Sequence, residues 1–209
     1  VIGKAPQAVD RSLSKVLPID SVDEGELGLS LLAKYPSKIT RDLPTNSTQL
    51  EEARVEVYLN ILMSQLTSQL QKSRAKPFKY NVRVLSSNYP NAMALPGGVI
   101  LVTMGLYKTL KSESEIVAVL GHELGHVELS HCMSTVKFQL ITKKILHSNL
   151  GEIADFTQRF LFGHSFSKTQ EDDADAYGFQ LLVNSQYDPS ALALSFRSLL
   201  EQSKQKYEG

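Results

Sequence analysis

The segment from Glu113 to Cys132 restricts the fold more than any other part of the chain. Its apolar residues are so dense that the sequence predicts a helix buried in the protein core. Five of them are Ile116, Val117, Val119, Leu120 and Leu124. Ser112 is the expected N-cap residue, and Glu115, three residues later, is its expected capping-box partner. The same segment carries ionisable side chains, which need polar partners inside a core.

Those side chains include His122, Glu123 and His126. The two histidines are four residues apart, so both imidazoles leave the same face of the helix and can share one Zn²⁺ ion. Glu123 lies between them and can reach a water molecule on such an ion without binding the ion itself. Zinc lowers the pKa of that water towards about 7, and a carboxylate can then take its proton during attack on a carbonyl group. Gly125 would let another element approach this helix closely.

A short pattern of this kind also occurs by chance on exposed helices that bind no metal. The buried context argues against that alternative, because a metal supplies the partners that buried histidines need. Catalytic zinc sites usually have three protein ligands and one water, so a third ligand has to come from another element.

Glu171 is the best candidate for this third ligand. It lies in an acidic run that opens a second predicted helix, with Asp175 four residues later on the same face. One carboxylate can bind the metal while the other accepts a hydrogen bond from the free N–H of a ligand histidine, which fixes its tautomer. The alternative is an acidic first turn that only stabilises its own helix dipole. Both roles can hold together, and the residues alone leave the choice open.

The remaining histidines and the single cysteine have weaker patterns. On one continuous helix His131 would be rotated away from the face of His126, so a structural role is expected. His147 and His164 have no metal-ligand spacing. Cys132 excludes an intramolecular disulfide and a cysteine-rich zinc knuckle, and a buried, unreactive thiol is expected.

The composition is that of an ordinary globular protein. The chain has 209 residues, of which 42% are hydrophobic and 21% charged, enough for one compact domain. Lys plus Arg and Asp plus Glu number 22 each, which gives no reason to expect a nucleic acid or an anionic membrane as the main partner. No apolar run approaches the ~18 to 20 residues that span a bilayer. The start at Val1 lacks the apolar core of a signal peptide and is compatible with a removed signal or anchor.

Periodicity elsewhere predicts an α+β fold, mostly helical, with a small antiparallel or mixed sheet beside the buried helix. Residues 1–21 are expected to form an arm and residues 22–209 one domain. The predicted strands, Tyr80–Ser86 and Val99–Thr103, are expected to pair with each other, and Pro96–Gly98 forms a bend. The other predicted helices cover 22–35, 44–74, ~134–147, ~151–162, 167–184 and the residues after Pro189.

Three ordered blocks of the sequence resemble the M48 family of gluzincin zinc metallopeptidases, above all its soluble bacterial periplasmic branch. The blocks are Asn91–Ile100 followed by Gly105 and Leu106, then Glu115–Val127 ending in His131, and then Ser167–Gly178. The resemblance implies a zincin-type domain with one Zn²⁺ per chain. His122, His126 and Glu171 would bind the zinc, Glu123 would be the general base and acid, and Asp175 would orient His122.

The resemblance also implies a substrate and a location. Asn91, Ala92, Met93 and Ala94 would form an edge strand above the metal, where a peptide or an unfolded protein pairs as an added strand. The implied activity is that of an endopeptidase in protein quality control of the cell envelope, in the periplasm or at the outer membrane. Peripheral membrane association through a removed N-terminal anchor is compatible with it. No nucleic acid partner is expected. No sequence pattern indicates the oligomeric state or the group that stabilises the oxyanion.

Two features depart from the family pattern. Lys168 stands where members commonly have Arg, which keeps the charge but loses bidentate hydrogen bonding. No histidine follows His164, so a downstream His-Pro element is either truncated or absent. Two alternatives stay open: a non-catalytic chaperone or binding module, against which the intact Glu123 argues, and a latent peptidase. The plug of a latent enzyme would come from residues 134–165 or from a missing C-terminal segment.

Overall fold

The computed structural model describes residues 21–33, 46–70, 75–142 and 166–207. These residues form an α+β fold, mostly helical with one small mixed sheet, as the sequence predicts. The helix expected at ~151–162, residues 1–20 of the expected arm, and both His147 and His164 lie outside the described residues. No helix in the described ranges is long and apolar enough to cross a membrane.

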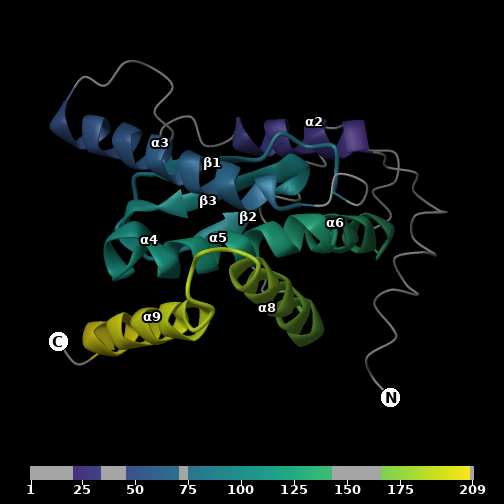
Figure 1. The fold of residues 1–209 in the computed structure, drawn as a ribbon. Coiled ribbons are helices and arrows are strands. Elements are labelled where there is room, and N and C mark those ends of the chain that lie inside the picture. The colour runs from purple at the N-terminus through teal and green to yellow at the C-terminus, as the bar shows by residue number, and fades with distance from the viewer. Residues whose placement is uncertain (1–20, 34–45, 71–74, 143–165, 208–209) are drawn as a thin grey trace.

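Helix α5 (Glu113–Glu128) forms the centre of the fold. It lies between the sheet on one side and helices α8 (Lys168–Val183) and α9 (Ala191–Tyr207) on the other (Figure 1). As predicted, Ser112 caps its N-terminus, where the Ser112 hydroxyl oxygen accepts from the backbone N–H of Glu115 at 3.2 Å. The apolar residues of α5 are therefore covered on both sides, which explains why most residues of the helix are buried.

The sheet has three strands in the order β1 (Asn81–Leu85), β3 (Val99–Thr103) and β2 (Ala92–Ala94). Strand β1 pairs with β3 in parallel, and β2 pairs with β3 antiparallel. The two strands expected from the sequence do pair with each other. The sequence predicts either an antiparallel or a mixed sheet, and the sheet is mixed. The chain already reverses once between β2 and β3, so β3 runs in the direction of β1.

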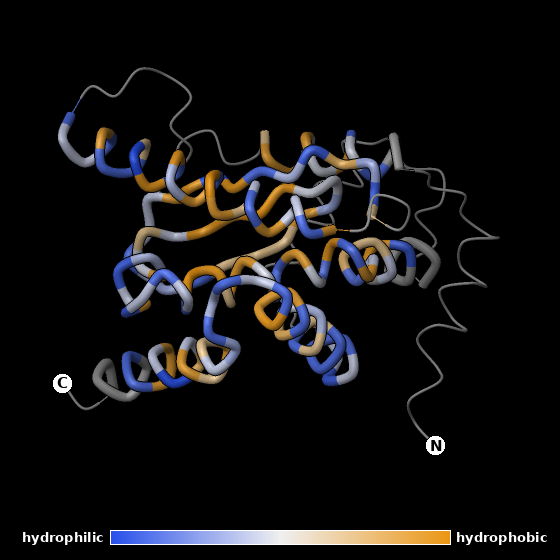
Figure 2. Tube along the Cα trace, in the orientation of Figure 1, coloured by the Kyte–Doolittle hydropathy of each residue, from blue (hydrophilic) through white to orange (hydrophobic). Residues whose placement is uncertain are grey.

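Both faces of the central strand are covered. All residues of β3 are buried, and the trace through the middle of the sheet is largely hydrophobic (Figure 2). Ile100 and Val102 pack in the main core with α5 and α3 (Ser47–Ser68). Their neighbours Val99 and Leu101 pack in a second cluster with α2 (Ser21–Leu32) and α6 (His131–Thr142).

Strand β2 is an edge strand with a defined outer side. The backbone N–H of Leu95 donates to β3 at 2.8 Å, and the carbonyl oxygen of Asn91 accepts from β3 at 3.0 Å. Residues of an antiparallel ladder alternate between groups that face the partner strand and groups that face away. Ala92 and Ala94 therefore turn their backbone groups outward. No other strand of the described residues pairs with this edge.

The helix expected over residues 113–132 is in fact two helices. Helix α5 ends at Glu128, and α6 begins at His131. Between them Ser130 has a φ of 62°, in the left-handed region that interrupts a right-handed helix. The apolar pattern continues across this break, so periodicity alone does not reveal it. The expectation that His131 is rotated away from the face of His126 assumed one continuous helix. That assumption is wrong, because His131 begins a second helix.

Most other helix boundaries are close to the predicted ones. Helix α3 is shorter than predicted and begins after Asn46, whose side chain accepts from the N–H of Gln49 at 2.9 Å. A 3-10 turn (Pro96–Gly98) occupies the predicted bend. The short helix α4 (Met104–Thr109) was not predicted from periodicity, and Thr103 caps it.

Candidate metal centre

Small residues determine how closely α8 approaches α5. A Cβ atom on Gly125 would lie 3.1 Å from the Cα and carbonyl oxygen of Ala174, and one on Gly178 would lie 2.9 Å from the backbone nitrogen of His122. These positions leave no room for a side chain, because the neighbouring atoms are backbone atoms that cannot rotate away. The expected close approach at Gly125 is confirmed, and it brings the acidic face of α8 to the histidines.

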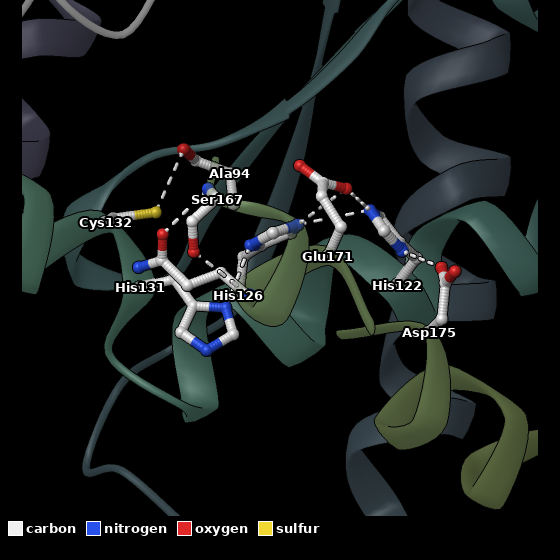
Figure 3. Close-up of polar contacts among 9 residues, drawn as sticks. Ala94, His122, His126, His131, Cys132, Ser167, Glu171 and Asp175 are labelled. Carbon is white, nitrogen blue, oxygen red and sulfur yellow. Dashed lines mark hydrogen bonds and ion pairs between the residues drawn. The ribbon is translucent and has the colours of Figure 1, made fainter. Parts of the chain in front are cut away.

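Three side chains converge at this contact (Figure 3). The Nε2 atoms of His122 and His126 are 3.1 Å apart, and Oε2 of Glu171 lies 3.5 Å from the first and 3.8 Å from the second. Ligands at 2.0–2.1 Å in tetrahedral geometry are separated by about 3.3 Å. The donor set therefore fits an ion of the size of zinc. Among the described residues, no other group of three His, Cys, Asp or Glu side chains comes together in this way.

Asp175 holds His122 from the opposite side of the ring. Its Oδ1 lies 2.8 Å from Nδ1 of His122, so Nδ1 carries a proton and donates it. The lone pair of the neutral ring is then on Nε2, which points to His126 and Glu171 (Figure 3). This arrangement fixes the tautomer that a metal ligand requires.

His126 has a ring partner that sequence reasoning missed. Its Nδ1 lies 3.1 Å from Nδ1 of His131. If Nε2 of His126 is to offer a lone pair to the other ligands, its Nδ1 must carry the proton and donate to His131. The turn at Ser130 places His131 there. The one signal in the sequence was the position of His131 at the end of the second resemblance block.

Burial keeps both of these rings neutral. Desolvation, aided by the charges of His122 and His131, lowers the pKa of His126 to about 2. Desolvation likewise lowers the pKa of His131 to about 4. Phe166 stacks on His126 with ring centroids 4.0 Å apart and an angle of 19°, which adds to the burial. Neutral imidazole is the form that binds a metal.

Glu123 lies beside these residues with only 8% of its surface exposed. Burial raises the pKa of its carboxyl group, while His122 and a hydrogen bond from the backbone of Ala94 oppose the shift. A carboxylate with a raised pKa is better matched to proton transfer near neutral pH. Cys132 donates to the carbonyl oxygen of Ala94 at 3.4 Å. Its thiol is buried, as expected, and burial raises its pKa, which supports the expectation that it is unreactive.

A cleft of about 150 Å³ opens beside Glu123 and His122. Asn91 and Ala92, from the predicted substrate-binding segment, line it. Met93 packs instead against the second hydrophobic cluster, and Ala94 is buried between Glu123 and Cys132. The structure thus brings only the first half of that segment to the cleft.

Known proteins of similar sequence include several metalloproteases. The model of peptidase family M48 matches residues 54–203. Metalloprotease LoiP of Escherichia coli (strain K12) is 32% identical over 60% of this chain and 54% of its own length. Mitochondrial metalloendopeptidase OMA1 of Arabidopsis thaliana is 27% identical over 62% of this chain and 30% of its own length.

A third relative, the beta-barrel assembly-enhancing protease of Yersinia pestis, is 25% identical over 78% of this chain and 36% of its own length. The chain thus spans about a third to a half of the length of these relatives. The family match covers most of the chain and includes both helices that carry the metal-binding geometry. The chain therefore belongs to peptidase family M48.

Proposed function

We propose that this chain is a zinc-dependent endopeptidase in which His122, His126 and Glu171 hold one Zn²⁺ ion. The observation that carries the proposal is the convergence of two imidazole nitrogens and one carboxylate oxygen within 4.8 Å of one another, beside the buried carboxyl group of Glu123. Membership of family M48 supports the same activity. A non-catalytic binding module would have no use for a buried carboxyl group of raised pKa at this position.

Each residue has a defined part in the proposed reaction. A bound zinc ion would supply the Lewis acidity that makes water a nucleophile near neutral pH. Glu123 accepts the proton of the attacking water and returns it to the leaving amine. Asp175 keeps His122 in the tautomer that binds the ion, through the contact of 2.8 Å. His131 does the same for His126 at 3.1 Å.

The substrate is an extended peptide that pairs with the outer edge of β2. Ala92 offers an outward N–H and C=O on a strand that lines the cleft, so main-chain pairing would not depend on the substrate sequence. The backbone groups of Asn91 and Met93 are directed towards β3. Of these two, Asn91 would contribute through its side chain, which lines the cleft.

The cellular setting proposed is protein quality control in a bacterial envelope, with unfolded proteins as substrates. The name of one relative, beta-barrel assembly-enhancing protease, supports this setting. Another relative is named as a mitochondrial enzyme, so the names of the relatives are compatible with more than one cellular setting.

Metal removal tests the proposal directly. The purified chain should contain about one zinc per chain and cleave denatured casein. A chelator should abolish cleavage, and added Zn²⁺ should restore it, while Mg²⁺ should not because two imidazoles favour zinc over magnesium. Zinc-loaded protein that binds unfolded casein but never cuts it would indicate a binding module instead.

Loss of the His131 contact should weaken zinc binding without removing a ligand. We expect His131→Phe, which keeps a ring of similar size, to lower zinc affinity about 10- to 100-fold, as is typical when the partner of a ligand histidine is lost. Competition with a chromogenic chelator measures this affinity. His131→Asn is the matched control, since its amide oxygen can take the place of the accepting Nδ1 and should restore most of the affinity. Equal affinity of wild type and His131→Phe would show that the contact does not orient His126.

A further inference from the structure

We propose that a polar hollow between α3, α4 and the loop after β1 binds one Ca²⁺ ion. The residues of its lining that matter here are Glu51, Glu52, Ser86, Ser87, Asn88 and Lys108. None of them lines the cleft beside the metal centre or belongs to its three converging side chains. The hollow has a volume of about 260 Å³, enough for an ion with several water molecules. The inference goes beyond the proposed peptidase function and does not depend on it.

A row of polar side chains on α3 faces the outer edge of β1. Asn60 donates to the carbonyl oxygen of Val82 at 2.8 Å and accepts from the N–H of the same residue at 2.9 Å. Glu56, four residues earlier, accepts from the N–H of Val84 at 2.8 Å. Four residues of a helix advance by about 6 Å and two residues of a strand by about 6.6 Å. Successive members of the row therefore meet every second residue of the strand.

Glu52 is the next member of this row, and no strand is left for it to bind. Strand β1 ends at Leu85, one residue before the position that Glu52 would meet. Only 6% of the surface of Glu52 is exposed, and its Oε1 has no hydrogen-bond partner. Burial of a carboxylate without a partner is costly. Stabilising the dipole of α3 would not require that burial, so this carboxylate points to a ligand held in the hollow.

The lining of the hollow has the composition of a site for a hard cation. It includes two carboxylates, two hydroxyl groups and one side-chain amide, and neither an imidazole nor a thiol. Carboxylate and carbonyl oxygens are the ligands of hard cations, whereas zinc and softer metals favour imidazole and thiolate. Ca²⁺ accepts about six to eight oxygen ligands in irregular geometry, and Mg²⁺ demands a near-ideal octahedron. The lining therefore favours calcium.

Lys108 is the cationic residue of this lining and competes with the ion for negative charge. Its Nζ lies 3.3 Å from Oε1 of Glu51, and both side chains are more than half exposed. An exposed ion pair of this kind contributes little to stability, so Lys108 can turn into water when an ion binds. Glu52 lies outside the pair, and its buried carboxylate would carry most of the affinity.

A calcium ion in the hollow would fix the loop between β1 and β2. Ser86, Ser87 and Asn88 line the hollow, whereas Pro90 and Asn91 line the cleft beside the metal centre. One short loop thus borders both cavities. Because local opening of this loop would break the contacts of the ion, bound calcium should slow hydrogen exchange in residues 86–91.

Thermal unfolding of the zinc-loaded full chain tests the site without any substrate. A site with two carboxylates should bind with a Kd of about 10⁻⁴ to 10⁻³ M, as extracellular calcium modules do. At about 10 mM Ca²⁺ the Tm should therefore rise by about 3 to 10 °C, and at the same concentration of Mg²⁺ by less. Absence of a rise with Ca²⁺ would overturn the proposal. A rise with spermidine but not with Ca²⁺ would also overturn it, in favour of an organic cation.

Glu52→Gln keeps the shape of the side chain and removes its charge. Without calcium this variant should not be less stable than the wild type, because it loses an unpaired buried carboxylate. Ca²⁺ should no longer raise its Tm. Glu26→Gln is the matched control, since Glu26 is exposed on α2 and does not line the hollow, and it should respond as the wild type does. A calcium response of Glu52→Gln equal to that of the wild type would contradict the assignment.

Lys108→Gln tests the site in the opposite direction and decides the question even if Glu52→Gln does not fold. Removal of the competing cation should increase the affinity for Ca²⁺ by about 3- to 10-fold, which calorimetric titration measures. Unchanged or lower affinity would place the ion outside this hollow. Hydrogen exchange slowed by calcium elsewhere but not in residues 86–91 would do the same. The zinc content of these variants should equal that of the wild type, and none of these measurements requires peptide cleavage.

Discussion

Replacement of Glu123 by Gln should reduce kcat for peptide cleavage by about 10²- to 10⁴-fold, the usual contribution of a general acid–base group. Gln keeps the size of the side chain but cannot accept a proton from water. The change also removes a carboxyl group whose pKa is raised by burial, so the folded protein should not lose stability. Steady-state kinetics on a peptide substrate measure the loss.

Zinc content provides the control for this variant. Glu123 does not belong to the three side chains whose ligand atoms converge, so Glu123→Gln should bind zinc as wild type does and should still bind the peptide. Unchanged cleavage by a zinc-loaded Glu123→Gln protein would remove Glu123 from the reaction. Loss of zinc from this variant would instead make Glu123 a ligand, contrary to the assignment above.

Replacement of Glu171 by Ala should remove zinc from the protein and abolish activity with it. Two protein ligands are too few for a catalytic zinc site, so the loss in affinity should exceed the about 10- to 100-fold expected for an outer contact such as that of His131. Metal analysis after gel filtration measures the zinc that remains.

The effect on stability distinguishes a ligand from a structural residue. Burial and the charges of Asp175 and Asp172 raise the pKa of Glu171, so its negative charge is disfavoured in the folded metal-free protein. Glu171→Ala should therefore keep or raise the Tm of the metal-free chain but lose the Tm increase that zinc binding gives the wild type. Asp172→Asn, on the same helix and exposed, is the matched control and should keep that increase. Undiminished zinc in Glu171→Ala would exclude Glu171 as a ligand.

The proposed ligands on the two helices could not be predicted equally well from the sequence. His122, Glu123 and His126 lie on one helix, where a spacing of four residues fixes their common face regardless of what packs around it. Glu171 is 45 residues beyond His126, and the same acidic run would appear in a helix that only stabilises its own dipole. The family resemblance, not the local pattern, favoured it as a ligand, and its role remains a prediction to be tested by zinc content.

Two errors in the sequence-based predictions have a common origin, since neither feature leaves a signal in the apolar pattern. Residues 113–132 have a continuous apolar pattern, but Ser130 adopts a left-handed conformation that ends α5 and redirects the chain. A single φ angle of this kind leaves no periodic signal. The same holds for the parallel pairing of β1 and β3, since each strand has the same alternation whichever direction its neighbour runs.

The sequence by itself determined the central helix, its cap at Ser112 and the common face of His122 and His126, because these depend on contacts within a few residues. Only the tertiary structure decided which groups come together around these histidines. The close contact of Gly125 with Ala174 brings Glu171 and Asp175 to the histidines, and the turn at Ser130 brings His131 to His126. Such distances depend on how backbones pack across elements far apart in the chain, and no local spacing encodes them.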